Sequence, residues 1–217
     1  LVSSEPVKVN ADGTFTIVVT GYLGPAVFIL ASANEGAPDY LDEALGTVVD
    51  LSNALAAVAT IVEGNQSLNV TPLSTLAAMD LLIQLNGLKP DSESVTVPTG
   101  DNVITETALS AAISKIAGAF GLTVDEYNGT VDPAVDITVT DAQVTATAAT
   151  ANKYGLVLAA LSGLDFNDNE DLLGGLQDIL DSIDSEGVMS SVGQGLVLRG
   201  AVTAATVTEL DVQEVAG

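Results

Sequence analysis

The chain has 217 residues and is strongly acidic: five Lys and Arg residues face 29 Asp and Glu residues, a formal net charge of −24. So few basic residues cannot build a positive face for phosphates, which argues against nucleic acids and anionic membrane surfaces as partners. Cysteine and histidine are absent, which excludes disulfides, thiol nucleophiles, Cys or His zinc sites and imidazole bases. Hydrophobic residues make up 47%, enough to bury a core.

The first 33 residues have the pattern of β-structure. Alternating apolar residues predict strands at residues 7–9 and 14–20, with a hairpin turn at 10–13 between them. A second turn at 21–25 precedes a buried strand at 26–30. These strands resemble one edge of an immunoglobulin-like or carboxypeptidase-regulatory-like sheet.

From residue 34 the apolar period changes from two to about 3.6, which predicts a mainly helical lobe with short strands over residues 34–217. The expected fold class is therefore α+β, with a small N-terminal β-sheet lobe packed against the larger helical lobe as one compact module. Residues 196–210 fit a Thr-rich helix or a strand, and 135–139 a short strand. Helices are predicted at 39–62, from Thr71-Pro72 to Asn86, at 105–119, at 140–161 and at 170–183.

No apolar run is long enough to span a membrane, so we expect no membrane insertion. The sequence starts at Leu1 without an initiator Met or a signal peptide, so we expect a monomeric module within a longer protein.

The best metal-binding candidate is the segment 165–171. Its oxygen-bearing side chains alternate as in the first half of an EF-hand loop, where a tight turn directs them at one cation; they are Asp165, Asn167, Asn169 and Asp171. Two departures exclude a true EF-hand, because Glu170 replaces the invariant glycine and Leu176 replaces the bidentate glutamate. The alternative is that Asn167 or Asp168 only caps the next helix.

Two further acidic groups have the same character. The second contains Asp125, Asn128 and Asp132, and the third contains Asn34, Glu35, Asp39, Asp42 and Glu43. Each alone also fits a solvated turn or a first helical turn. Together with the self-repulsion of the chain, they predict that Ca²⁺ is bound. The competing explanation of the charge is a cytosolic protein of a halophile.

We expect no enzymatic activity. Paired carboxylates for glycoside hydrolysis usually lie among aromatic platforms, and this chain has four Tyr, four Phe and no Trp. No Gly-x-Ser-x-Gly elbow is present, and no histidine is available to activate a serine.

Two segments resemble modules of giant bacterial surface proteins: residues 68–77 (LNVTPLSTLA) and 153–165 (KYGLVLAALSGLD). Within that group the chain most resembles the peptide-binding domain of RTX adhesins, secreted calcium-dependent proteins by which Gram-negative bacteria hold other cells. The resemblance implies an extracellular module on the bacterial cell surface. It also implies bound calcium and recognition of the C-terminal ends of partner proteins.

A protein this acidic repels a peptide carboxylate, unless a bridging calcium ion inverts the local charge. Arg199, the only arginine, is the alternative carboxylate clamp; otherwise it is a surface charge or an internal partner of some acid. The competing functions are a carbohydrate-binding module and a structural spacer of the adhesin. A sugar binder would usually show exposed aromatics near calcium, and the large helical region argues against a spacer.

Overall fold

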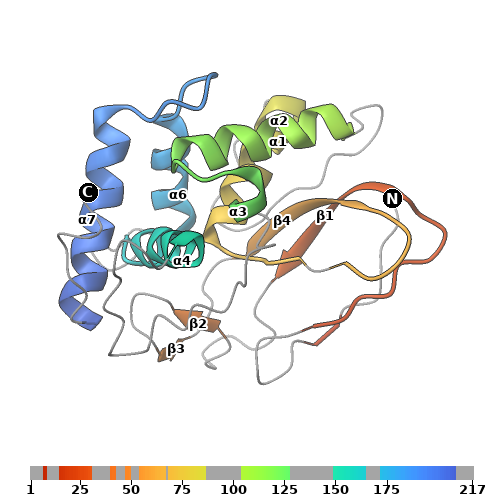
Figure 1. Cartoon of the computed structure of the whole chain (residues 1–217), viewed down its shortest axis with the longest axis horizontal. Helices are drawn as coiled ribbons and strands as arrows, with labels where there is room; N and C mark the ends of the chain where they lie inside the picture. The colour runs from red at the N-terminus through yellow and green to blue at the C-terminus, as the bar shows by residue number, and fades with distance from the viewer. Residues whose placement is uncertain are drawn as a thin grey trace.

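The computed structural model describes residues 7–8, 15–30, 40–42, 47–49, 54–66, 68–86, 104–127, 149–164 and 172–208. Within these ranges the fold is α+β, as the sequence predicts, with two antiparallel strand pairs and six helices (Figure 1). In chain order the elements are β1 (Gly24–Leu30), β2 (Tyr40–Asp42), β3 (Thr47–Val49), β4 (Leu55–Ile61), α1 (Pro72–Asn86), α2 (Glu106–Ala119), α3 (Val124–Tyr127), α4 (Ala149–Ser162), α6 (Leu172–Asp181) and α7 (Ser191–Thr208).

The larger sheet is the antiparallel pair of β1 and β4. Gly24 lies opposite Ile61 and Leu30 lies opposite Leu55, so the two strands pair along their whole length. The strand predicted at residues 26–30 is therefore confirmed. In the smaller sheet β2 pairs with β3, with Tyr40 opposite Val49.

The helix predicted over residues 39–62 is wrong, because this region contains the strands β2, β3 and β4. Residues 55–59 form a continuous apolar run, in which periodicity alone does not separate a buried strand from a buried helix. Four consecutive side chains, from Leu55 to Val58, are buried, so both faces of this part of β4 are covered. Pairing with β1 and contact with α1 therefore decide the conformation.

The predicted strands at 7–9 and 14–20 are not formed in the residues that the structure describes there, 7–8 and 15–20. Exposure still alternates as in a strand: Phe15, Ile17 and Val19 are half-buried, whereas the three residues that follow them are exposed. The pattern is present, but no described segment pairs with it. The turn predicted at 21–25 is confirmed at its start by a bend at Gly21, whose φ of 74° suits glycine. Its last two residues belong instead to β1, which begins at Gly24. The predicted hairpin turn at 10–13 lies outside the described residues.

Helix α1 begins where the sequence predicts, at the Thr71-Pro72 pair. Thr71 Oγ1 accepts a hydrogen bond from Ser74 N at 3.2 Å, and Ser74 Oγ accepts one from Thr71 N at 2.8 Å. This reciprocal capping satisfies two backbone donors, and Pro72 occupies the first helical position. The helix contacts β4, α2, α4 and α6, so it is buried on nearly every side and forms the centre of the core.

The other predicted helices are largely confirmed. Thr105 Oγ1 accepts a hydrogen bond from Ala108 N at 3.1 Å and caps α2, as predicted. Helix α4 confirms the second half of the helix predicted at 140–161, and α6 matches the one predicted at 170–183. The predicted start at Thr140 and the predicted strand at 135–139 lie outside the described residues.

Residues 196–210 fit either a helix or a strand by sequence, and they are helical up to Thr208. This segment is part of α7, which packs against α4. Two glycines make this packing close. A Cβ atom added at Gly163 would overlap the carbonyl oxygen of Gly200, and one added at Gly200 would overlap that of Ala160. The two helices therefore touch through their backbones.

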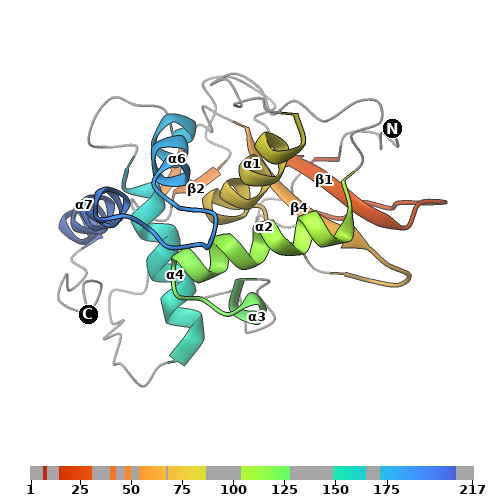
Figure 2. The same ribbon diagram turned by 90° about the horizontal axis from the view of Figure 1, so that it is seen from above.

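Helix α7 lies at one end of the molecule and the β1–β4 pair at the other, with α1 between them (Figures 1 and 2). Among the described residues, no helix combines the length and apolar character needed to cross a membrane.

Candidate functional site

The predicted calcium loop connects α4 with α6. All four of its expected ligands (Asp165, Asn167, Asn169 and Asp171), and the alternative cap Asp168, lie outside the described residues. The residues on both sides of the loop are described and belong to the core: Leu164 is 4% exposed and Leu172 is 7% exposed. An ion held by this loop would therefore be coupled to the packing of α4 and α6.

The second acidic group is only partly described, because Asn128 and Asp132 lie outside the described ranges. Asp125 is exposed in the first turn of α3. Thr123 and Glu126 cap this short helix: Thr123 Oγ1 accepts from Glu126 N at 3.2 Å, and Thr123 N donates to Glu126 Oε2. An acidic side chain in the first turn of a helix is stabilised by the helix dipole, which explains this position of Asp125 without a metal. Its role as a metal ligand stays a prediction. In the third group only Asp42, the last residue of β2, is described.

Arg199 lies on an exposed side of α7. Both views show α4 between α7, the helix that contains Arg199, and α3, the helix that contains Asp125 (Figures 1 and 2). The exposed side chains of Val192, Leu198 and Val202 lie on the same helix. Arg199 as a carboxylate clamp stays a prediction.

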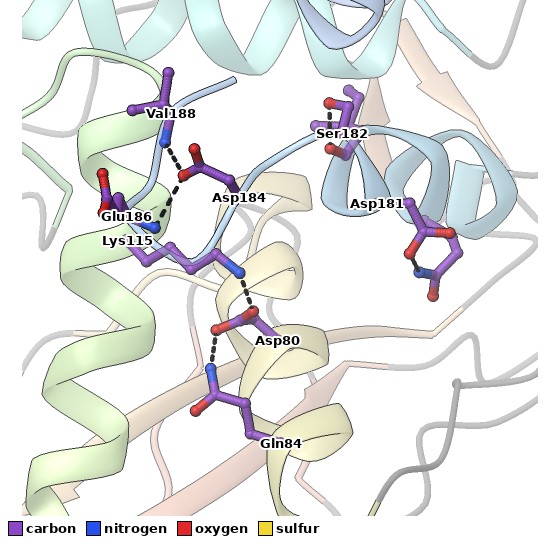
Figure 3. Close-up of polar contacts among 10 residues, drawn as sticks. Asp80, Gln84, Lys115, Asp181, Ser182, Asp184, Glu186 and Val188 are labelled. Carbon is purple, nitrogen blue, oxygen red and sulfur yellow. Dashed lines mark hydrogen bonds and ion pairs between the residues drawn. The ribbon is translucent and has the colours of Figure 1, made fainter. Parts of the chain in front are cut away.

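A buried polar cluster joins α1 to α2 (Figure 3). Lys115 Nζ lies 2.7 Å from Asp80 Oδ1, and Gln84 Nε2 donates to Asp80 Oδ2 at 2.5 Å. The Lys115 and Asp80 side chains are 17% and 7% exposed. Both carboxylate oxygens of Asp80 thus have a donor, which is the condition for keeping a charge inside a core.

The turn between α6 and α7 holds another acidic side chain in a structural role. Asp184 Oδ1 accepts hydrogen bonds from Glu186 N and Val188 N, both at 2.9 Å (Figure 3). Gly187 has a φ of 81° and lies against the backbone of Lys115, where a Cβ atom would come within 2.8 Å of the Lys115 carbonyl oxygen. This turn therefore packs against α2 only because residue 187 is glycine.

Side chains seal the edge of β4 that faces away from β1. Ala56 N donates to Thr75 Oγ1 at 2.9 Å, and Ala56 O accepts from Ser74 Oγ at 2.7 Å. Further along the strand, the Gln66 amide donates to Thr60 O at 3.0 Å and accepts from Val62 N at 2.9 Å. The start of α1 and one glutamine thus take the place of a neighbouring strand.

Two tyrosines, Tyr127 of α3 and Tyr154 of α4, are buried in the core. Thr71 Oγ1 and Tyr154 Oη are 3.4 Å apart. The Tyr127 hydroxyl is buried and has no hydrogen-bond partner in the part of the chain that the structure describes. Burial, with a smaller contribution from Tyr154, raises the pKa of Tyr127 far above its ordinary value.

Two of the described lysines are engaged by the protein itself. Lys115 pairs with Asp80, and Lys153 on α4 donates to the carbonyl of Gly121, just after the end of α2. A cation near the carboxyl end of a helix is favourable because carbonyl groups there lack partners within the helix. These two lysine charges therefore have structural roles within the fold.

Within the described ranges, no group of three or more acidic side chains is placed to hold a metal ion.

The buried Asp80–Lys115 pair is the feature that sequence reasoning missed, although a signal for it exists. Asp80 interrupts the apolar positions Met79, Leu81 and Leu82 of a helix with no other charged residue. An isolated charge in such a helix needs a buried partner. Lys115 is the only basic residue of α2, and the packing of α2 on α1 makes it the partner.

Comparison of the chain with protein-family models, with curated proteins and with solved structures found no match.

Proposed function

We propose that this chain is a calcium-dependent, non-enzymatic adhesin module that binds surface proteins of partner cells by their C-terminal peptide ends. In this proposal it belongs to a longer protein on the outside of a bacterial cell. In the same proposal β1 is part of an immunoglobulin-like or carboxypeptidase-regulatory-like sheet, although the strands predicted at 7–9 and 14–20 are not formed in the residues described there.

The observation that carries the proposal is the pair of segments that resemble modules of giant bacterial surface proteins. Residues 68–77 include the start of α1, and residues 153–164 form most of α4 and its end. The two helices pack together, and Thr71 Oγ1 lies 3.4 Å from Tyr154 Oη. Segments that are 83 positions apart at this contact thus belong to one packed unit, as expected for two parts of a single module.

The charge distribution supports calcium as the group that receives the peptide carboxylate. The chain has only five basic residues, and Lys115 and Lys153 already serve Asp80 and Gly121. A carboxylate that approaches a surface of net charge −24 is repelled unless a cation lies between them. A loop-bound Ca²⁺ with an open coordination position supplies that cation, and the peptide oxygens complete its shell.

The direct test compares two libraries of eight-residue peptides, one with free C-terminal carboxylates and one with C-terminal amides, in millimolar calcium. We expect binding of free-acid peptides and at least about tenfold weaker binding of their amides, because the amide removes the charged ligand. Acetylation of the peptide N-terminus should leave binding unchanged. Equal binding of both libraries, or binding only to a glycan array, contradicts the proposal.

Loss of binding in EDTA is not sufficient, because a protein that unfolds without calcium gives the same result. The variant Asp165→Ala therefore accompanies the libraries, with Glu63→Gln as a control that removes one exposed acidic charge in a turn. Asp165→Ala should remain folded at saturating calcium, as judged by circular dichroism, and lose peptide binding. Glu63→Gln should bind like the original chain.

A further inference from the structure

The two outer edges of the larger sheet differ in their hydrogen bonding. On β4, Ala56 N and O and Thr60 O are bonded to side chains of α1 and to Gln66, so they point away from β1. In an antiparallel pair, residues whose backbone groups point away from the partner lie opposite residues that do the same. Ala56 faces Ile29 and Thr60 faces Pro25. The backbone groups of Pro25, Val27 and Ile29 are therefore directed to the outer edge of β1.

One end of this outer edge is closed. Pro25 has no N–H group, and its carbonyl oxygen accepts a hydrogen bond from the Tyr22 hydroxyl at 2.5 Å. Beyond it, Val27 and Ile29 each present one donor and one acceptor. No strand in the described part of the chain pairs with them, because β4 is the sole described partner of β1. Within the described residues, the outer edge of β1 thus has a short series of backbone donors and acceptors at Val27 and Ile29, which starts just after Pro25.

The chemistry of this edge selects its occupant. Donors and acceptors that alternate along a strand are matched by another extended main chain. Natural edge strands are usually protected by charged side chains, but residues 13–34 contain no charged residue in a chain of net charge −24. Two copies of so acidic a chain repel each other, which disfavours a dimer through this edge. An uncharged or basic peptide meets no such barrier.

We propose that the outer edge of β1, at Val27 and Ile29, binds an extended uncharged or basic peptide as an added strand. This inference rests on the proposed function in one respect, that the ligand is a peptide. It assigns the peptide main chain to the sheet, whereas the proposed calcium contact concerns only the peptide's terminal carboxylate.

The test uses the whole chain and the peptide acetyl-Lys-Thr-Val-Thr-Val-Thr-Lys-amide, which has no charged ends. Amide hydrogen exchange is followed by NMR at millimolar peptide. Exchange of the Val27 and Ile29 amides should slow by about tenfold or more, because a new hydrogen bond protects each of them. The Ala26 and Phe28 amides already point to β4 and should not change. This period of two distinguishes strand addition from general stabilisation.

The matched variants are Val27→Pro, which removes the outward N–H without breaking a bond to β4, and Val27→Ala, which keeps it. We expect Val27→Pro to weaken peptide binding by about tenfold and Val27→Ala to weaken it much less. No binding of the peptide, uniform protection, or protection at other residues overturns the inference. If Val27→Pro does not fold, the exchange pattern of the original chain still decides. Capture of free-acid peptides without this pattern supports the proposed function and rejects strand addition.

Discussion

Lys115 Nζ lies 2.7 Å from Asp80 Oδ1 between α1 and α2, where both side chains are largely buried. In a chain with five basic residues, one of them is thus used to neutralise an acid inside the core. The pair also connects α1, the central helix, to the helix against which Gly187 packs.

Breaking this pair from one side should destabilise the fold strongly. Lys115→Met leaves the Asp80 carboxylate with the Gln84 amide as its one donor among the described residues. A buried charge that has lost its partner costs about 3–5 kcal/mol. The double variant Asp80→Leu with Lys115→Met should recover most of this loss, because no charge remains buried. Urea denaturation measures the free energy of unfolding.

The control for this experiment is Lys8→Met, which makes the same change of charge at an exposed position. It should alter the free energy of unfolding by less than about 0.5 kcal/mol. If Lys115→Met costs no more than Lys8→Met, the ion pair does not contribute to stability.

Two glycines of α7 should respond in opposite ways to the same substitution. Gly200→Ala places a methyl group against the carbonyl of Ala160, and such overpacking costs about 1–3 kcal/mol. Gly195 has open space around its position, so Gly195→Ala should stabilise the helix by about 0.5–1 kcal/mol. Thermal melts of both variants measure the difference. Equal melting temperatures would mean that α4 and α7 do not approach as closely as described.

Tyr127 should make stability fall at high pH. Burial raises the pKa of its hydroxyl in the folded protein above the value in the unfolded chain, so the folded state holds the proton more tightly. The contribution of Tyr127 to the free energy of unfolding is fully present below about pH 10, the pKa of tyrosine in the unfolded chain. Above this pH the contribution falls by about 1.4 kcal/mol per pH unit. Tyr127→Phe should remove this part of the pH dependence.

At pH 7, Tyr127→Phe should leave the free energy of unfolding unchanged or raise it by up to about 1 kcal/mol. The hydroxyl is buried without a hydrogen-bond partner in the described residues, and its removal ends the desolvation cost. A loss above about 1 kcal/mol would show that the hydroxyl has a stabilising partner.

The helices could be predicted because their ends carry local chemistry. The Thr71-Pro72 start, the Thr105 cap and the apolar period each act over a few residues, and these signals do not depend on the rest of the fold. Strand β4 could not be predicted, because its apolar run fits a buried helix equally well. Its conformation depends on pairing with β1, about 30 residues earlier in the chain.

In the candidate site, too, local features could be predicted from the sequence and long-range contacts could not. Oxygen-rich segments such as 165–171 are visible in the sequence, because metal ligands are recognised by type and spacing. The Asp80–Lys115 pair joins residues 35 positions apart, and only the packing of α1 on α2 selects Lys115 as the partner. Sequence therefore indicated the acidic loops, and it missed the charge that the fold encloses.

Calcium should raise the stability of the folded chain. The net charge of −24 favours expansion, and an ion that binds only the folded state stabilises it by mass action. At a concentration about 100 times the dissociation constant, the gain is about 2.7 kcal/mol for one site. Thermal melts in millimolar calcium and in EDTA, both at the same ionic strength, should therefore differ by several degrees.

Asp165→Ala should reduce this calcium-dependent gain and remove one site in titration calorimetry. The loop lies between the buried residues Leu164 and Leu172, so an ion there connects α4 to α6 and its loss is felt by the core. If the residue served only the start of the next helix, the variant would cost about 0.5–2 kcal/mol in calcium and in EDTA alike. Unchanged number and affinity of sites would remove Asp165 as a ligand. Equal melting temperatures of the original chain in calcium and EDTA would instead favour a halophile's acidic surface, stabilised by salt in general.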